Sequence, residues 1–273
     1  KASWRLCEWF SETQANGPLP SSYELPEVGP GINGCLPEDL LNDLEQLMNG
    51  AYRPLHPGAL AHLDPPPLSS SIVGELICAG LNNNLLAEEL SPSLTSLERK
   101  LCQWISQRVG MLPGSGGVAA SGGTLSNLMA IVIARHQADL QSDSSSIILA
   151  SADAHVSFQK AVRVMGLKED SFRQIDIDDE GRMSIDSLNK TLLELREENR
   201  KCFAIVATAG TTIRGAIDPL IPIAEIASRE GIWLHVDASI GGVFALSDRT
   251  SNLVEGLQMA DSIALNPQKL LGI

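Results

Sequence analysis

The sequence is short of cationic side chains, of aromatic side chains and of long apolar runs. Its 273 residues include 20 Lys and Arg against 33 Asp and Glu, which gives a formal net charge of -13. No basic stripe is present, and this argues against a nucleic-acid backbone or an anionic membrane surface as a partner. Apolar runs such as 128–134 fall far below the roughly 20 residues that span a bilayer. We therefore expect no nucleic-acid partner and no membrane partner.

The cysteines are few and scattered. There are five of them, an odd number, and none stands in a C-x-x-C spacing, which argues against a disulfide framework and against a zinc site. We expect no bound metal and a reducing, cytoplasmic setting. Residues 1–10 also lack the basic start and apolar core of a signal peptide.

The N-terminal part of the chain differs in composition from the remainder. Residues 1–70 are rich in Pro and Gly and contain only short amphipathic pieces, which predicts an arm that packs on something else. Helices are expected at 71–81 and 93–109 from their apolar periodicity. We divide the chain into an N-terminal arm and helical segment, 1–90, which packs in a dimer, and a large domain, 91–273.

Short apolar runs alternate with helical patterns from residue 116 onward. This alternation predicts an α/β fold with a mostly parallel sheet covered by helices on both faces. In such sheets, ligands bind outside the carboxyl ends of the strands. Strands are expected at 117–120, 146–150, 203–208, 232–236 and 262–265, with helices near 124–139, 156–165, 184–199 and 219–230 between most of them.

Three of the segments that follow these runs carry weak signals of a binding site. Gly123 and Thr124 precede a helix, where small residues and free N–H groups favour a phosphate, although a tight turn explains them equally well. No Lys follows the glycines, so the segment is not a P-loop. His155 lies beyond the strand end at 150, where it could also be structural. The small and hydroxyl residues at 208–212 are compatible with ordinary turn chemistry.

Two later segments carry stronger signals. The run 232–236 ends in Asp237, and alternation puts His235 on the same face. A buried carboxylate without a partner costs several kcal/mol, so a cation should face Asp237, either a Lys or Arg or a protonated ring nitrogen. Lys269 follows the run 262–265, behind Pro267, which fixes the turn. Most lysines are solvated, and only the position of this one suggests chemistry.

Taken together, these segments resemble the group II amino-acid decarboxylases that depend on pyridoxal 5'-phosphate (PLP). The resemblance runs in family order from about residue 50 to the end of the sequence. The matching segments are His56-Pro57, Glu89-Leu90-Ser91-Pro92, Ala120-Ser121-Gly122-Gly123-Thr124 with Asn127, Asp153-Ala154-His155, 207–212 with Gly215 and Asp218-Pro219, His235-Val236-Asp237-Ala238, and Asn266-Pro267-Gln268-Lys269.

The resemblance implies a PLP fold of type I, similar to aspartate aminotransferase, and a catalytic role for three residues. Lys269 forms the Schiff base with PLP, Asp237 pairs with the pyridinium nitrogen, and His155 stacks on the ring near the substrate carboxylate. Gly123 and Thr124 resemble the phosphate cradle. The residues implied to bind the cofactor are Gly123, Thr124, His155, Thr212, Asp237, Asn266 and Lys269.

The implied reaction is decarboxylation of an L-amino acid by a homodimer. The motifs leave glutamate, aspartate, diaminobutyrate and aromatic amino acids open as substrates. Transamination or another carbon–carbon cleavage on the same fold stays an alternative, as does a non-catalytic subunit that needs a partner chain. The segments His56-Pro57 and 82–84 could line the substrate pocket, or they could serve only as turns and caps.

Three departures from the family pattern stand out. Gln268 occupies the position before the lysine where His is usual, which removes a titratable neighbour. Ser239-Ile240 stands where Ala and an aromatic residue are common. Family members continue well beyond the lysine, whereas this sequence ends at Ile273. We expect either a fragment or a protein completed by a second chain.

Overall fold

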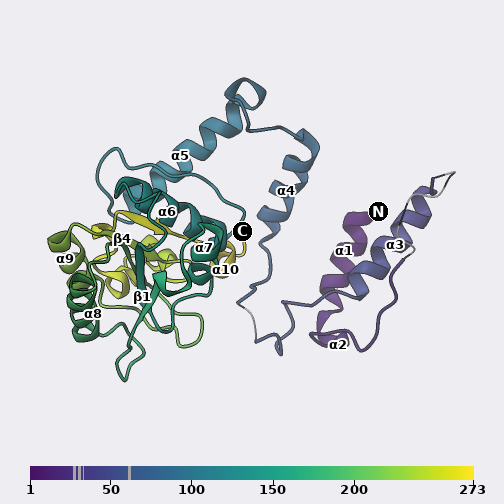
Figure 1. Ribbon diagram of the computed structural model, residues 1–273. Helices are drawn as coiled ribbons and strands as arrows, with labels where there is room; N and C mark the ends of the chain where they lie inside the picture. The colour runs from purple at the N-terminus through teal and green to yellow at the C-terminus, as the bar shows by residue number, and fades with distance from the viewer. Residues whose placement is uncertain (27–28, 30–31, 33, 61–62) are drawn as a thin grey trace. The chain divides into compact units, whose positions relative to one another are not determined.

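The computed structural model describes residues 1–26, 29, 32, 34–60 and 63–273. The chain divides into two compact units, one formed by Lys1–Val73 with Gln268–Ile273 and the other by Gly74–Pro267. Figure 1 draws both units. The larger unit holds the sheet, and most of the residues expected to carry chemistry lie on it.

Five parallel strands form one sheet in the order β2-β1-β3-β4-β5. The register aligns the carboxyl ends of three neighbours, because Thr208 pairs with Asp237 and Asp237 pairs with Ala264. Side chains just beyond these strands therefore lie at one edge of the sheet. The strands are β1 (Ile147–Ser151), β2 (Phe172–Ile175), β3 (Cys202–Thr208), β4 (Trp233–Asp237) and β5 (Ser262–Ala264).

Helices cover both faces of this sheet (Figure 1). Alternate residues of β1 serve two different cores. Ile147 and Leu149 pack with the apolar sides of α8 and α9, whereas Ile148 and Ala150 pack with those of α6 and α7. Burial on both faces explains why Ile147 to Ala150 in β1 are all apolar. The covering helices are α6 (Gly123–Gln137), α7 (Ser157–Val164), α8 (Ile185–Glu197) and α9 (Leu220–Glu230).

Local sequence signals fix the helix ends. The hydroxyl of Ser184 accepts a hydrogen bond from the Ser187 backbone N–H (3.2 Å) and caps the start of α8. Gly231, in the left-handed conformation with φ 66°, ends α9. Short 3₁₀ turns complete the connections: η1 (Glu88–Leu90), η2 (Glu169–Ser171), η3 (Gly241–Leu246), η4 (Ser251–Val254) and η5 (Leu257–Met259).

The unit of Lys1–Val73 with Gln268–Ile273 is helical. Arg53 is buried, and its guanidinium lies over the ring of Trp9, 5.1 Å from the centroid. The Gly272 carbonyl accepts a hydrogen bond from the Leu68 backbone N–H (2.9 Å). The helices are α1 (Ala2–Ser11), α2 (Thr13–Asn16), α3 (Pro37–Asn49) and α10 (Gln268–Leu271), and further along the chain lie α4 (Ser69–Leu81) and α5 (Pro92–Arg108).

The predicted α/β class and parallel sheet are confirmed, with one strand wrong and one missed. The run 117–120 forms no strand: the Ala119 backbone N–H donates to the Glu98 carboxylate (2.8 Å), and Val118 is 62% exposed. The Glu98 carboxylate thus accepts the backbone hydrogen bond that a neighbouring strand would accept in a sheet. The edge strand β2 escaped prediction because its sequence, FRQI, is only partly apolar. No helix among the described residues is long and apolar enough to cross a bilayer.

Candidate active site

The site lies where the order of the sheet reverses. The chain passes from β1 to β2 on one side and later returns to β3 on the other side of β1. The crevice outside the carboxyl ends of such strands is where α/β sheets bind ligands. The segments that follow β1, β3, β4 and β5 contribute Asp153 to His155, 209–212, 238–240 and Asn266, respectively.

Asp237, the last residue of β4, is a buried carboxylate held by neutral donors. It is 5% exposed, and its oxygens accept hydrogen bonds from Asn127 Nδ2 (2.9 Å) and the Ser239 backbone N–H (3.1 Å). No Lys or Arg within Gly74–Pro267 forms an ion pair with it. Because burying an unpaired carboxylate is costly, this arrangement suits a cationic ligand group.

His235 lies on the same side of β4 as Asp237, as predicted, and is fully buried. Its Nε2 lies 3.1 Å from Asn127 Oδ1, and its Nδ1 lies 2.9 Å from Ser262 Oγ. The ring also meets Phe158 edge to face, with centroids 5.9 Å apart. Burial lowers the pKa of His235 below its usual range, so the ring is neutral. His235 is thus a neutral support for Asn127 rather than a cationic partner for Asp237.

His155 follows β1 and is half-buried. Its Nδ1 lies 2.9 Å from Ser157 Oγ and accepts a longer bond from the Ser157 backbone N–H (3.3 Å). The Ser157 hydroxyl is also 3.1 Å from Asn127 Nδ2. The structure therefore connects His155 to Asp237 through Ser157 and Asn127, although the two residues are far apart in the sequence.

The start of α6 lies against the segment after β4. Gly122 has φ 155°, and Gly123 opens the helix. A Cβ at Gly123 would come within 2.8 Å of Ser239 Oγ, so a larger residue here would force the Ser239 hydroxyl to move. The unpaired N–H groups of a helix start favour an anion. This helix start therefore lies beside the loop that follows Asp237.

The segment after β3 contributes buried hydroxyl groups and a second buried acid. Thr208 Oγ1 is buried and finds no hydrogen-bond partner within the described ranges. Thr211 Oγ1 accepts from the Ala216 backbone N–H (3.1 Å), which closes the turn. Asp218 accepts from the backbone N–H groups of Met183 and Thr208, both at 2.7 Å. Burial raises the pKa of Asp218 to about 6.

Among the described residues of the larger unit, the other predicted site residues make no hydrogen bond to this network. Thr124 and Thr212 are exposed, and Asn266 is half-buried just after β5. Lys269 is half-buried on α10, which belongs to the unit with Lys1–Val73. Its neighbour Gln268 donates to the Asp64 carboxylate (3.2 Å) within that unit.

The segments His56-Pro57 and 82–84 make turn contacts. His56 Nδ1 accepts from the Gly58 backbone N–H (2.9 Å), and Asn84 Oδ1 accepts from the Leu86 backbone N–H (2.7 Å). These bonds favour the turn interpretation for both segments.

Three residues of the network carried no role in the sequence prediction: Asn127, Ser157 and Ser262. Asn127 appeared only as part of a motif, yet it is the centre of the network. Its position four residues after Gly123 places it one helical turn further along the same side of α6, a spacing that could have identified it. Ser157 and Ser262 gave no signal, because buried serines are common and only the fold brings these two together.

A doubly wound α/β domain with an anion-favouring helix start beside a buried acid that has only neutral donors within its unit is suited to a small ligand carrying both a phosphate and a cationic group. Comparison with known proteins identifies the family. Residues 30–273 match the model of the pyridoxal-dependent decarboxylase conserved domain, and the chain belongs to this family. The fold is accordingly that of the type I PLP enzymes.

Two curated relatives illustrate the match. The chain is 38% identical over 247 residues to an L-2,4-diaminobutyrate decarboxylase of Rhizobium meliloti, covering 90% of this chain and 49% of the relative. It is 35% identical over 276 residues to human cysteine sulfinic acid decarboxylase, covering 98% and 54%. The chain thus spans about half the length of these relatives.

A solved structure agrees with the fold. The crystal structure of the glutamate decarboxylase domain of a diaminobutyrate-pyruvate transaminase and L-2,4-diaminobutyrate decarboxylase from Vibrio parahaemolyticus superimposes with a TM-score of 0.92. It is 28% identical in sequence, and the match covers 99% of this chain and 63% of that one. The five-stranded parallel sheet and its helices are therefore common to both.

The residues of the larger unit fit a pyridoxal group. Asp237 is a buried acid without a cation inside its own unit, which suits a protonated ring nitrogen. Gly123 at the helix start suits a phosphate. The unpartnered hydroxyl of Thr208 is a further polar group available at the same edge of the sheet.

Proposed function

We propose that this chain binds PLP and that the protein to which it belongs decarboxylates an L-amino acid. The single observation that carries the proposal is the pairing of Asp237 with neutral donors at the strand edge. Such a carboxylate gains from a cationic ligand, and a pyridinium nitrogen satisfies it without a Lys or Arg. The family membership of residues 30–273 supports the same cofactor.

Each residue has a defined task in this proposal. When bound, PLP supplies a ring that withdraws electrons from the substrate. Asp237 would hold the proton on the ring nitrogen, and His155 would contact the ring and the substrate carboxylate. Lys269 would hold the cofactor covalently. Gly123 and Thr124 bind the phosphate with backbone and hydroxyl donors, and Thr212 and Asn266 complete the cofactor contacts.

Borohydride reduction tests the cofactor part of the proposal. PLP added to the purified chain should produce a new near-ultraviolet band, and reduction should fix one pyridoxyl group on Lys269, mapped by peptide mass spectrometry. Lys269→Ala is the matched control and should yield no fixed group at that position. A reduced wild-type chain with no pyridoxyl group on Lys269 would overturn this assignment.

A product assay tests the reaction. L-2,4-diaminobutyrate and cysteine sulfinate are the first substrates to try, because relatives that act on them match this chain. Release of CO2 without a keto acid supports decarboxylation, whereas keto-acid formation supports transamination on the same fold. The assay is run on the 273-residue chain and on any longer form. Turnover by the longer form alone favours the alternative in which this chain needs further segments or a partner.

The assembly and the setting of the protein are also proposals. We propose that residues 1–90 form an arm that packs in a homodimer, while 91–273 form the cofactor domain. Exposed apolar side chains on α1 and α4, such as Trp4 and Leu76, support this role for the arm. The five cysteines are all free, which supports a reducing cytoplasm. Light scattering with PLP present tests the dimer, and a monomer would contradict it.

A further inference from the structure

The buried polar groups near β4 form one continuous chain of hydrogen bonds with Asn127 at its centre. The side-chain amide of Asn127 contacts three partners: Asp237, Ser157 and His235. Asn127 is 1% exposed, so water does not compete for these bonds. An amide has one acceptor oxygen and two N–H donors, and all three capacities are used here.

The orientation of the Asn127 amide follows from its contact with Asp237. The carboxylate oxygens accept hydrogen bonds and donate none, so the amide group 2.9 Å away must be the NH2. Turning the amide over would place Oδ1 against Asp237 Oδ2, an unfavourable contact between two acceptors. The second N–H of the same NH2 group then donates to Ser157 Oγ at 3.1 Å.

This orientation also fixes the proton of His235. Asn127 Oδ1 is an acceptor, so the His235 nitrogen 3.1 Å away, Nε2, must carry the hydrogen. In the neutral ring, Nδ1 is then an acceptor for the Ser262 hydroxyl at 2.9 Å. Ser262 Oγ in turn accepts from Trp233 Nε1 at 2.8 Å. Every donor on this branch has one acceptor.

The other branch fixes the proton of His155. Because Ser157 Oγ accepts from Asn127, its own hydrogen is available for His155 Nδ1 at 2.9 Å. The Ser157 backbone N–H points at the same nitrogen, at 3.3 Å. With two donors aimed at Nδ1, the neutral ring carries its hydrogen on Nε2. His155 therefore presents an N–H donor, not a lone pair, at its other edge.

We propose that Asn127 is a positioning residue that sets the tautomers of both histidines and holds the Asp237 carboxylate with the same amide. Its consequence for the reaction rests on the proposed function, since His155 and Asp237 are the residues assigned to the cofactor. An N–H donor on His155 can bind a substrate carboxylate, whereas a lone pair would repel it. The tautomers themselves can be measured without any cofactor.

The test uses ¹⁵N-histidine NMR on the chain without PLP, at a pH where the rings are neutral. The spectrum distinguishes a protonated Nε2 from a protonated Nδ1, and the signal lost in His155→Gln identifies His155. In the wild type, both His155 and His235 should carry the hydrogen on Nε2. A wild-type His155 protonated on Nδ1 would overturn the proposal.

Asn127→Asp should reverse the tautomer of His155 and leave the tautomer of His235 unchanged. The new carboxyl group faces the Asp237 carboxylate, so the two share one proton, which lies between their facing oxygens. The group at position 127 still accepts from His235 Nε2, but it has no hydrogen left to donate to Ser157. The Ser157 hydroxyl then donates to the new carboxylate in place of His155, and His155 moves its hydrogen to Nδ1 to donate to Ser157. We expect the His155 signal to switch to the Nδ1–H pattern while the His235 signal stays. An unchanged His155 signal in a folded Asn127→Asp chain contradicts the proposal.

Ser157→Ala gives a second test if Asn127→Asp does not fold. It removes the hydroxyl that joins Asn127 to His155, so one Asn127 N–H loses its acceptor and the 3.3 Å backbone N–H is the sole remaining donor to His155 Nδ1. The single tautomer should then become a mixture. The remote, buried Ser171→Ala is the matched control and should change neither signal. A pure Nε2–H signal in Ser157→Ala contradicts the proposal. Failure of PLP to bind the wild type, with these tautomers as expected, would count only against the proposed function.

Discussion

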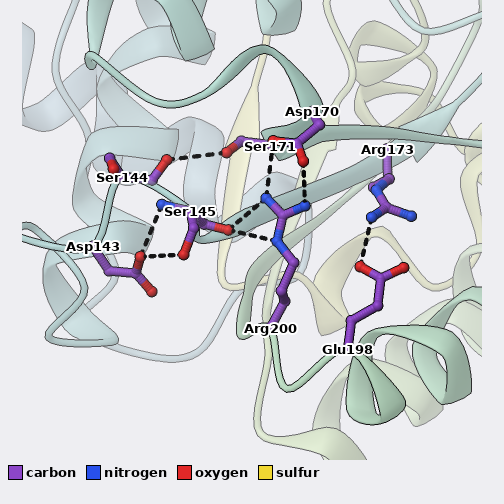
Figure 2. A network of polar contacts seen from close by, with 8 residues as sticks. All are labelled: Asp143, Ser144, Ser145, Asp170, Ser171, Arg173, Glu198 and Arg200. Carbon is purple, nitrogen blue, oxygen red and sulfur yellow. Dashed lines mark hydrogen bonds and ion pairs between the residues drawn. The ribbon is translucent and has the colours of Figure 1, made fainter.

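The same parallel sheet carries a polar network at each of its ends, and the two networks differ in how their charges are balanced. At the amino end, Arg200 joins the segments before β1 and β2 to the start of β3 (Figure 2). Its guanidinium donates to the Ser145 carbonyl (3.0 and 2.8 Å) and to both oxygens of Asp170 (2.7 and 3.2 Å). The half-buried Arg200 cation thus pairs with both a backbone carbonyl and an exposed acid.

The pKa values of the acids at the two ends of the sheet shift in opposite directions. At the amino end, hydrogen bonds from Arg200 hold the pKa of Asp170 below its usual range, and the Ser145 hydroxyl does the same for Asp143. At the carboxyl end, burial raises the pKa of Asp218 to about 6. Asp237 has only neutral donors inside its unit.

This difference indicates which polar residues only hold the sheet together. Charges that are paired at the surface contribute modestly to folding and need no ligand. Buried acids without a cation cost free energy in the folded chain, and a ligand that supplies the charge can recover it. The predictions below test this contrast, from the largest expected effect to the smallest.

Asp237→Asn should weaken PLP binding much more than it changes the stability of the chain. We expect the affinity for PLP to fall about 10²-fold, since losing one partner of a buried charge pair costs about 3 kcal/mol. The stability of the chain without PLP should change less, because the new amide oxygen can still accept from Asn127. The measurement is a PLP titration followed by absorbance.

The matched control is Asp170→Asn at the other end of the sheet, which should leave the PLP affinity unchanged. Equal affinities for Asp237→Asn and the wild type would remove the contrast between the two networks.

Asp218 should make the chain less stable as the pH rises from about 4 to about 6. In the folded chain this acid holds its proton up to about pH 6, whereas the ordinary value is 3.8. Between these values the unfolded chain binds fewer protons, so the free energy of unfolding falls with pH, by up to about 3 kcal/mol. Urea denaturation at several pH values, compared with Asp218→Asn, measures this contribution.

The asparagine in Asp218→Asn cannot ionise. The fall in the free energy of unfolding between about pH 4 and pH 6 should therefore disappear in this variant, even if its overall stability changes. The acids of the amino end contribute in the opposite sense, with stability lost as the pH falls. Identical pH profiles for the two chains would show that the proton on Asp218 is not retained.

Gly123→Ala should destabilise the chain by about 2 kcal/mol, in the range of overpacking effects. The new Cβ would lie 2.8 Å from Ser239 Oγ but 3.7 Å from Ser239 Cβ. Removing the hydroxyl in the double variant Gly123→Ala with Ser239→Ala should therefore restore most of the loss. Urea denaturation of the four chains of this cycle gives the coupling. Additive effects would mean that Ser239 is not what requires a glycine at 123.

Much of the fold could be predicted from the sequence because its signals are local. The runs at 146–150 and 232–236 are mostly apolar, and β1 and β4 lie within one residue of them. The strand expected at 117–120 failed because a nearby glutamate supplies the hydrogen bond that a neighbouring strand would give. Tertiary contacts decide which apolar run pairs with a neighbouring strand. The periodicity of the sequence carries no information about those contacts.

The candidate site was predictable only in part for a similar reason. Alternation along β4 placed His235 with Asp237, and that prediction is confirmed by their shared contact with Asn127. The bonds of Ser157 and Ser262 could not be predicted, since they join residues 30 and 27 positions from their partners. The role of Lys269 stays a prediction, and its chemical test is the borohydride experiment.

Arg200→Met should give the smallest effect, a loss of about 1 kcal/mol. The Arg200 side chain is 14% exposed and Asp170 is 61% exposed, so the ion pair itself contributes little and the loss comes from the unpaired Ser145 carbonyl. Arg173→Met is the control, because its pair with Glu198 is partly exposed on both sides (29% and 38%) and should cost less. Both variants should bind PLP as the wild type does. A PLP affinity weakened by Arg200→Met would mean that the two ends of the sheet are coupled, and that the amino-end network does more than hold three strands in place.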